Sequence, residues 1–365
     1  MKRSGGNLLT DKRENLLTDK RVVVTGGTGS FGKVIVRRLL EGEVGLPAEV
    51  VVFSRSEATQ HQMRLDFQHR RVATDEIVYE EERHSRLHFQ VGDIRDPASV
   101  VSLLRGRDVV FHAAAMKQVP VCEYNPFEAV KTNVVGAENL VRAIRDYELG
   151  VETVIGVSTD KACKPVNVMG MTKAVQERIL NRANIESPGT RFLAARYGNV
   201  LASRGSVVPL FHEQIRNGGP VTMTSPDMTR FLLSLDRAVD TVFDALQEGG
   251  PGETYIPVLP SALIRDLADA LIGDRPIEIE WVGIRPGEKI HEILVSEEEA
   301  PRTFKRGLNL VILPLLPELR SEPLNAEPLG GREYSSANET LEPTAVLELL
   351  RENKLMLDDA PVFAA

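Results

Sequence analysis

Residues 21–32 read RVVVTGGTGSFG, and this stretch decides the fold. Its first five residues form a continuous apolar run of the kind that a parallel sheet buries on both faces. The glycines that follow have the spacing GxxGxxG, and the apolar residues after them recur at helical spacing. A strand, a glycine loop and a helix in this order are typical of a dinucleotide-binding fold, in which the backbone approaches a pyrophosphate at the helix N-terminus. The residues expected to bind the cofactor here are Gly26, Thr28, Gly29, Ser30, Phe31 and Gly32.

The next apolar run, Val50–Phe53, ends in Ser54 and Arg55. Folds that bind NAD place an acidic residue at this strand end, where it holds the ribose 2′-hydroxyl. A cation beside hydroxyl groups suits a 2′-phosphate instead. The sequence therefore favours NADP over NAD, although Arg55 could also be a solvated loop residue.

Two later strand ends are expected to complete the cofactor site. Asp93 and Ile94 follow the run Leu87–Val91, which would place the carboxylate beside an adenine, although Asp at a strand end is also a common helix cap. Small residues after the run Val109–His112 would let a cofactor lie close to the backbone. These are Ala113, Ala114 and Ala115.

Apolar runs alternate with helical patterns as far as residue 200, which predicts a Rossmann-type doubly wound parallel sheet in the α/β class, with a smaller C-terminal lobe. Near the N-terminus the heptapeptide NLLTDKR occurs twice, at 7–13 and 15–21, and one copy is enough to lead into the first strand. The predicted organisation is a tail at 1–19, a nucleotide-binding domain at 20–200 with 236–258 returning to it, a lobe at 201–235 and 259–310, and a linker with one short helix at 311–365.

Composition excludes several classes of protein. The 365 residues carry a formal charge of −8, which argues against sequence-independent binding of nucleic acid. Two cysteines are too few for a disulfide framework, and their spacing to histidines suggests no metal site. No apolar stretch approaches the roughly 18 residues of a membrane span, and no signal peptide is visible. We therefore expect a cytoplasmic protein without a membrane partner.

A further apolar run, Val154–Val157, ends in Ser158, Thr159, Asp160 and Lys161. This places two hydroxyls, a carboxylate and an amine at the strand end where open parallel sheets hold their ligands. A helix then begins that carries Met169 and Lys173 one turn apart on one face. A lysine four residues after a reactive helical position is the pattern of short-chain dehydrogenases, in which the earlier position is normally Tyr.

The order of the motifs resembles that of extended short-chain dehydrogenase/reductases. More narrowly, it resembles the UDP-N-acetylglucosamine 4,6-dehydratases of the polysaccharide-biosynthesis family, in the variant with Met in place of Tyr. The resemblance runs from about Asp19 to Glu298 and implies an NADP-binding fold, a UDP-sugar in a cleft between two lobes, and a homo-oligomer. The motifs that carry it are TGGTGSFGK, GDIRD, HAAAMKQVP, EYNPFEAVKTN, STDKACKPVN, RYGNVLASRGSVVPLF, MTRF and RPGEK.

Dehydration across C5 and C6 of a hexose needs a neighbouring acid and base, once oxidation at C4 has made the C5 hydrogen acidic. Asp160 and Lys161 can supply one each, provided that the pKa of Lys161 falls far enough for it to act as the base. The resemblance implies that Lys173 holds the nicotinamide ribose and that Ser158 and Thr159 hydrogen-bond the sugar C4 hydroxyl. The thioether of Met169 cannot accept the C4 proton, so another group has to take it, and the candidates are Asp160, directly or through water, and then Lys173.

The same resemblance implies a set of residues that bind the UDP part of the substrate, with arginine suited to the pyrophosphate. These are Lys117, which could also contact the cofactor, Asn199, Arg204, Val208, Arg285 and Glu288. Other readings stay open: a nucleotide-sugar 4- or 5-epimerase, a 5,6-dehydratase of the same fold, or a non-catalytic NADP-binding protein. His112, on an apolar strand, is predicted to be a core residue, and Cys122 and Cys163 to be buried thiols.

Overall fold

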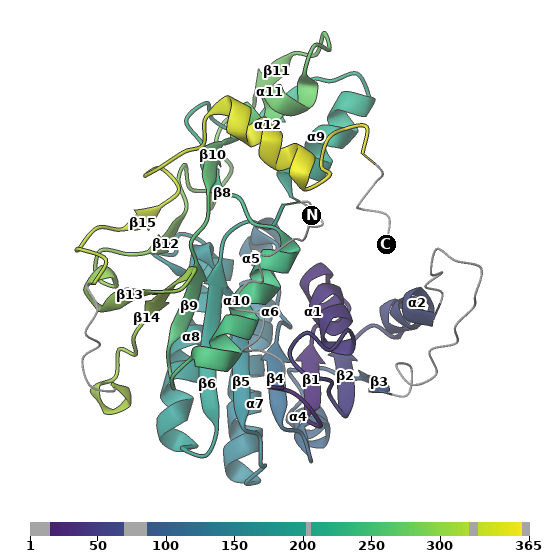
Figure 1. Ribbon diagram of the computed structural model, residues 1–365, viewed down its shortest axis with the longest axis vertical. Coiled ribbons are helices and arrows are strands. Elements are labelled where there is room, and N and C mark those ends of the chain that lie inside the picture. Colours follow the sequence, from purple (N-terminus) through teal and green to yellow (C-terminus); the bar gives the residue numbers. More distant parts are fainter. Residues whose placement is uncertain (1–14, 69–85, 202–205, 321–327, 360–365) are drawn as a thin grey trace, which may run out of the picture.

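A nine-stranded sheet with helices on both faces forms the centre of the molecule, and a smaller lobe lies over one end of it (Figure 1). The computed structural model describes residues 15–68, 86–201, 206–320 and 328–359. In the sheet the strand order is β13-β14-β9-β6-β5-β4-β1-β2-β3. These strands are β1 Arg21–Thr25, β2 Glu49–Ser54, β3 Leu87–Val91, β4 Val109–His112, β5 Thr153–Thr159, β6 Arg191–Tyr197, β9 Thr254–Pro257, β13 Thr303–Arg306 and β14 Asn309–Ile312.

The strands from β3 to β9 pair in parallel, which confirms the predicted doubly wound sheet. Alternate residues of β1 point to opposite faces of the sheet, and both faces are covered by helices. Val22 and Val24 join one apolar cluster, and Val23 joins another on the opposite face. All three are fully buried, and each such side chain stabilises the fold by about 2 kcal/mol.

Two sets of helices supply these clusters. On the face of Val22, α1 (Ser30–Leu40) packs beside α10 (Leu235–Glu248), so the chain returns to the main sheet after the first part of the lobe. On the face of Val23 lie α4 (Pro97–Leu104), α7 (Gly136–Asp146) and α8 (Val168–Glu186). Within the described ranges, no helix is long and apolar enough to cross a bilayer.

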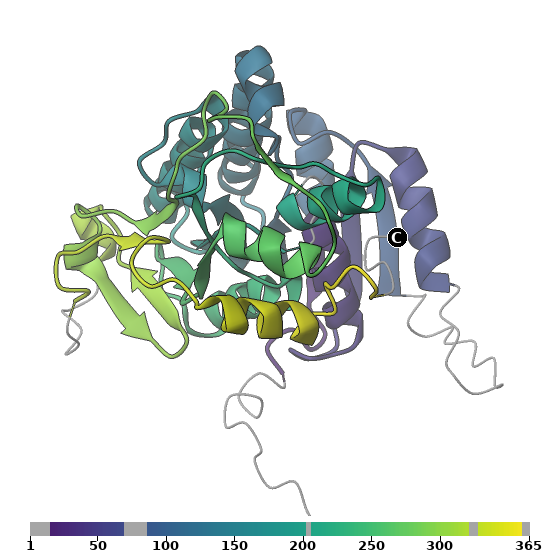
Figure 2. The same ribbon diagram turned by 90° about the horizontal axis from the view of Figure 1, so that it is seen from above.

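The lobe has its own apolar core, to which Val208, Phe211, Leu267, Val346 and Leu350 contribute. Seen from above, the C-terminal helix α12 lies alongside α11 (Figure 2). The elements of the lobe are α9 Val207–Arg216, β7 Val221–Met223, β8 Thr229–Phe231, β10 Ser261–Leu263, α11 Ile264–Ile272, β11 Ile279–Trp281 and α12 Pro343–Glu352.

The predicted boundaries are wrong at the C-terminal end. Strands β13 and β14, which the sequence placed in the lobe and the linker, extend the main sheet because β14 pairs antiparallel with β9. Helix α12 is part of the lobe because its residues Val346 and Leu350 are buried in the apolar core of the lobe. A further antiparallel pair joins β12 (Ile293–Val295) to β15 (Tyr334–Ser335).

Two smaller features differ from a simple reading of the sequence. The first NLLTDKR copy, at 7–13, lies outside the described residues, whereas Leu17 of the second copy is buried in the main core beside β1. The helical region from Pro126 to Asp146, where the apolar residues recur at helical spacing, is divided. It consists of α6 (Pro126–Ala129), a π-helical stretch at Val130–Val135 and α7, and is preceded by α5 (Val119–Tyr124). A further helix, α2 (Glu57–Gln68), follows β2.

Candidate active site

A cavity of about 820 Å³ lies between the carboxyl ends of the parallel strands and the lobe. It brings together almost all the residues that the sequence nominated. Two are exceptions: Asp93 does not line this cavity, and Arg204 lies outside the described residues. The nominated residues that line it are Gly26, Thr28, Gly29, Ser30, Phe31, Gly32, Ser54, Arg55, Ile94, Ala113, Ala114, Ala115, Lys117, Ser158, Thr159, Asp160, Lys161, Met169, Lys173, Asn199, Val208, Arg285 and Glu288.

The glycine loop is shaped by close backbone contacts. Gly26 has a φ of +67°, and a Cβ there would stand 2.8 Å from the Cα of Ala114. A Cβ on Gly32 would stand 2.4 Å from the Cα of Gly27, so only glycine lets α1 pack onto the loop. Helix α1 begins at Ser30 without a side-chain cap and without an acidic residue in its first turn. Its N-terminal N–H groups can therefore bind an anion such as a dinucleotide pyrophosphate.

At the neighbouring strand ends, Arg55 reaches the cavity and Asp93 does not. Arg95 holds the Asp93 carboxylate through Nε and a terminal nitrogen, at 2.8 and 2.6 Å. Burial alone would raise the pKa of Asp93, but the hydrogen bonds from Arg95 outweigh it and the pKa is lowered. The sequence located this carboxylate at a strand end but could not reveal that Arg95 binds it.

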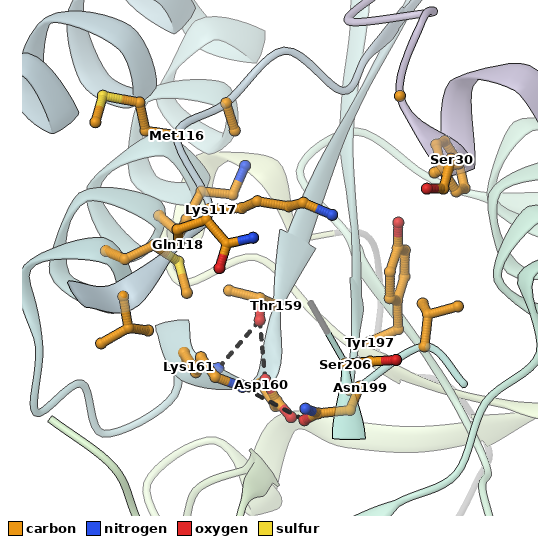
Figure 3. Close-up of a pocket in the computed structure, with 18 of the residues that line it drawn as sticks. Ser30, Met116, Lys117, Gln118, Thr159, Asp160, Lys161, Tyr197, Asn199 and Ser206 are labelled. Carbon is orange, nitrogen blue, oxygen red and sulfur yellow. Dashed lines mark hydrogen bonds and ion pairs between the residues drawn. The ribbon is translucent and has the colours of Figure 1, made fainter. Parts of the chain in front are cut away.

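Asp160 and Lys161 meet at one end of the cavity, in the short 3₁₀ turn that follows β5. Lys161 Nζ lies 3.0 Å from Asp160 Oδ1, which also accepts a hydrogen bond from the Thr159 hydroxyl at 2.9 Å. The amide oxygen of Asn199, just after β6, lies 3.4 Å from the same Nζ. Figure 3 shows these side chains converging, with Ser30 and Tyr197 on the other side of the cavity. A carboxylate and an amine therefore lie side by side at this end of the cavity.

Three further charged residues surround Lys161, and sequence reasoning did not nominate them. Glu292 Oε1 lies 3.3 Å from Lys161 Nζ and 3.8 Å from Arg230 Nε. Lys289 also lines the cavity and donates to the carbonyl of Cys163 at 2.6 Å. Lys289 is the last residue of RPGEK, Arg230 lies within MTRF, and Glu292 follows RPGEK by three residues. Their positions in or beside these motifs could have identified them from the sequence.

As a base, Lys161 was expected to need a lowered pKa, but its surroundings shift the pKa in the opposite direction. Burial would lower its pKa, but the charges of Asp160 and Glu292 outweigh burial, and the pKa is raised. In the ligand-free site Lys161 is therefore an ammonium. A nearby Lys173 does not change this, because the charges that act on Lys161 come from Asp160, Glu292 and Arg230.

Lys173 has the opposite electrostatics. It is 5% exposed, and its Nζ donates to the Val157 carbonyl at 2.6 Å and to Gln176 Oε1 at 2.8 Å. Burial lowers the pKa of Lys173 to about 8, against a smaller opposing effect of Glu177. Lys173 is therefore the lysine of this site that loses its proton most readily.

Met169, one turn before Lys173, lies in the first turn of α8. It is 4% exposed and packs with Cys122 and Ala129 in a small apolar cluster that borders the cavity. Its thioether offers no group that takes up a proton. The position normally held by Tyr in short-chain dehydrogenases thus contributes apolar surface here.

A buried ionic network supports the strand behind the acid and base. The Ser158 hydroxyl donates to Glu177 of α8, and Arg196 of β6 binds both Glu177 and Glu299, at 2.6 and 2.7 Å. Arg196 is 3% exposed, and the two carboxylates balance its charge inside the protein. The Ser158 hydroxyl, although its residue lines the cavity, is thus engaged by Glu177.

The π-helical stretch places two polar side chains beside the cavity. Thr132 lines it, and the Asn133 amide accepts from the backbone N–H of Met116 at 2.8 Å and donates to the Met116 carbonyl at 3.0 Å. Asn133 also donates to the hydroxyl of Thr172 in α8 at 3.0 Å. It therefore fixes the loop after β4 to the helix that carries Lys173.

The residues nominated for the nucleotide come from four different segments. Lys117 follows β4, Asn199 follows β6, and Val208 is buried in the first turn of α9. Arg285 and Glu288 lie on the loop between β11 and β12, where the Glu288 carboxylate accepts from the backbone N–H of Arg285 at 3.3 Å. Lys117 and Asn199 thus reach the cavity from the ends of sheet strands, whereas Val208, Arg285 and Glu288 reach it from the lobe.

The other reactive residues are structural. Cys122 and Cys163 are both buried and free, and burial raises the pKa of Cys163 to about 12. His112 is fully buried, with Nδ1 at 2.8 Å from the Thr25 hydroxyl, and burial lowers its pKa to about 3. Among the described residues, no group of three or more His, Cys, Asp and Glu side chains could hold a metal ion.

Comparison with known proteins places this cavity in context. The sequence profile of the family described as polysaccharide biosynthesis protein matches residues 22–312. A UDP-glucose 4-epimerase of Rickettsia conorii is 44% identical over 289 residues, which cover 78% of this chain and 80% of that protein. The family match includes the glycine loop and the end of β5.

Solved structures give the same fold. The structure of Pen from Bacillus thuringiensis is 33% identical, with a TM-score of 0.82 over 93% of this chain and 99% of the other. A dTDP-glucose 4,6-dehydratase, DesIV from Streptomyces venezuelae, solved with NAD bound, is 25% identical, with a TM-score of 0.61 over 74% of this chain and 86% of the other. Extended short-chain dehydrogenase folds that act on nucleotide sugars are thus what this chain resembles.

Proposed function

The chain belongs to the family of polysaccharide biosynthesis proteins, and from this premise we propose that it is an NADP-dependent UDP-N-acetylglucosamine 4,6-dehydratase. Its product would be a UDP-4-keto-6-deoxy-N-acetylhexosamine. One observation carries the proposal: Asp160 and Lys161 lie 3.0 Å apart at the strand end that faces the cavity. An acid and a base side by side are what elimination of water across C5 and C6 requires.

The residues have distinct roles in this reaction. A bound nicotinamide dinucleotide would accept hydride from C4 and return it to C6. Lys161 removes the C5 proton, and Asp160 protonates the leaving hydroxyl at C6. Because Met169 cannot take the C4 proton, Asp160 is the first candidate to do so, directly or through water, followed by Lys173. Asp160 would then pass to C6 the proton that it received from the C4 hydroxyl.

The cofactor preference rests on Arg55. The glycine loop and the uncapped N-terminus of α1 suit a dinucleotide pyrophosphate. Arg55 lines the cavity just beyond β2, where an acidic residue would bind the ribose 2′-hydroxyl of NAD. A guanidinium there favours the 2′-phosphate of NADP.

The UDP part is assigned to the lobe side of the cavity. Arg285 supports binding of the pyrophosphate, and Asn199, Val208 and Glu288 line the same region. Arg204 belongs to this assignment but lies outside the described residues. An acidic protein can bind a diphosphate in this way because a few cations are concentrated at the site.

The second candidate is a nucleotide-sugar 4-epimerase, and the name of the Rickettsia conorii relative favours it. Such an enzyme moves hydride off and back onto C4 and releases no water. It needs a group for the C4 proton, which Met169 does not provide, and it needs no acid–base pair for C5 and C6. The adjacent carboxylate and amine of Asp160 and Lys161 therefore favour the dehydratase.

Product analysis decides between these candidates. Purified protein is incubated with NADP and UDP-N-acetylglucosamine, and the product is examined by mass spectrometry and proton NMR. The dehydratase releases the mass of one water and leaves a methyl group at C6. A 5,6-dehydratase would release the same mass but form no methyl group. An unchanged mass, with or without inversion at C4, would overturn the proposal.

A homo-oligomer is also proposed. Large apolar side chains are exposed on α5, α6 and α8, among them Tyr124 at 88% and Phe127 at 67%. Neighbouring exposed apolar side chains are a common mark of subunit contacts. Light scattering of the purified protein should give a mass above that of one chain, and a monomer at micromolar concentration would contradict the proposal.

A further inference from the structure

Glu292 comes from a different part of the fold than the pair it contacts. It lies immediately before β12, and its Oε1 stands 3.3 Å from Lys161 Nζ, while Asp160 Oδ1 stands 3.0 Å from the same nitrogen. Lys161 is thus held between two carboxylates. The backbone N–H of Glu292 donates to the Ser336 hydroxyl at 2.9 Å, which fixes the chain at this point.

Burial makes this carboxylate unusual. Glu292 is 2% exposed, and among the described residues its Oε2 has no hydrogen-bond partner. Its charged neighbours are Lys161 at 3.3 Å and Arg230 at 3.8 Å, and Lys289 is close enough to interact with it electrostatically. Its second oxygen is therefore a buried acceptor that no described group occupies, beside a lysine that can donate to the same carboxylate.

The count of protons in the proposed reaction leaves one unassigned. Asp160 can take the C4 proton and later give it to the leaving hydroxyl, so its own protons balance. Lys161 begins as an ammonium, since both neighbouring carboxylates raise its pKa, and an ammonium cannot remove the C5 proton. A tyrosine in place of Met169 would take the C4 proton and leave Asp160 free to accept one from Lys161. In this chain Asp160 is already occupied.

We propose that Glu292 is the positioning residue that accepts the proton of Lys161 and so converts it into the base for C5. This inference rests on the proposed dehydratase function. It assigns to the loop before β12 a role in the acid–base chemistry. With Met at position 169, Asp160 takes the C4 proton, and Glu292 takes the proton of Lys161 in its place.

The proton transfers balance. An N–H bond of the Lys161 ammonium breaks and an O–H bond forms on Glu292, which leaves an amine and a carboxylic acid. The amine takes the C5 proton while Asp160 protonates the leaving C6 oxygen. When hydride has returned to C6, the Lys161 ammonium gives a proton to C5. Glu292 then returns its proton to Lys161, and all three side chains regain their starting charges.

The test uses Glu292→Gln in the full-length protein, because glutamine keeps the shape and can still accept from Lys161 but cannot take its proton. In a single turnover, oxidation at C4 should proceed, and reduced nicotinamide should accumulate because elimination is slowed by about 100-fold. Raising the pH should restore elimination by about tenfold per pH unit, since solvent can then discharge Lys161 before the substrate binds. A purely structural role would not produce this rescue.

The outcomes separate the two hypotheses. If the wild type releases no water, the proposed function fails, whatever Glu292 does. If the wild type is a dehydratase and Glu292→Gln eliminates water at the wild-type rate and pH dependence, or loses oxidation and elimination equally, the role of Glu292 is refuted. Should Glu292→Gln not fold, Glu292→Met, which keeps the length of the side chain and cannot take up a proton, must also accumulate reduced nicotinamide, and its failure to do so would refute the role of Glu292. Glu297→Gln, whose side chain is 64% exposed, is the matched control.

Discussion

The glycine loop at residues 26–32 and the charged cluster around Lys161 line the same cavity, but different contacts hold them in place. The loop depends on the backbone: Gly32 lies so close to Gly27 that no side chain fits between them. The cluster depends on charge: Lys161 is held between Asp160 and Glu292, which come from separate parts of the chain. One region positions a ligand through main-chain geometry, and the other sets where protons reside.

This difference teaches how the two regions tolerate change. A backbone contact cannot be relieved by moving a flexible side chain, so substitutions in the loop should impair cofactor binding and folding together. The charged cluster surrounds the amine of Lys161, whose side chain is one-fifth exposed. The carboxylates of the cluster have neutral amide counterparts of similar shape. Substitutions there should stop the reaction and leave cofactor binding intact. The predictions below test this separation.

Lys161→Ala should have the largest effect. We expect turnover to fall by about 1,000-fold, because the base for C5 is removed, while the affinity for NADP stays within twofold or so of the wild type. Steady-state kinetics and fluorescence titration of the cofactor measure the two quantities. Lys305→Ala, on the exposed edge strand β13, is the control. Wild-type turnover in Lys161→Ala would remove Lys161 from the mechanism.

Gly32→Ala should show the reverse pattern. Its Cβ would stand 2.4 Å from the Cα of Gly27, so α1 must shift away from the loop. We expect NADP affinity to fall by about 100-fold, which corresponds to about 2.7 kcal/mol, together with a lower melting temperature. Gly150→Ala is the matched control, since nothing lies within 4 Å of its Cβ position. Unchanged cofactor affinity in Gly32→Ala would show that the loop does not act through its backbone.

His112 gives a pH-dependent test of the sheet beneath the loop. Burial lowers its pKa from 6.5 to about 3, so between these pH values the unfolded chain binds more protons than the folded one, and stability falls as the pH falls. At about pH 5 the loss should be about 2 kcal/mol. Urea unfolding at neutral pH and at about pH 5 should show that the wild type loses this much more than His112→Asn. Equal losses in both proteins would contradict the assignment.

Arg55→Ala should have the smallest effect and a selective one. Loss of a charge-assisted contact to the 2′-phosphate should weaken NADP binding by about tenfold and leave NAD binding unchanged. Calorimetric titration with both cofactors measures this, with NAD as the internal control. An equal loss for both cofactors, or for neither, would remove Arg55 as the basis of the preference.

The sequence was a good guide where a structure depends on neighbouring residues. The run at 21–25 became β1 with its predicted bounds because both faces of that strand are buried, and continuous apolar runs predict such strands. Strands β13 and β14 were assigned wrongly because their pairing with β9 depends on contacts between distant segments. A short apolar stretch carries no signal for the edge of the sheet that it will join.

The same limit applied to the site. The positions of Asp160 and Lys161 followed from one strand end, but the raised pKa of Lys161 depends on Glu292, which is far away in the sequence. Asp93 and Ser158 were placed at strand ends correctly, yet Arg95 and Glu177 engage them. Sequence patterns predicted which residues gather at the cavity. The partner that each charged or polar group finds depends on the tertiary structure.

The position of solvent label in the product tests the central claim most directly. The reaction is run in deuterated water with UDP-N-acetylglucosamine and NADP, and the product is examined by mass spectrometry and NMR. If Lys161 exchanges the C5 proton during elimination, the product lacks one water and carries one deuterium at C5. A product with unchanged mass, or one that has lost water and holds no deuterium at C5, would contradict the account.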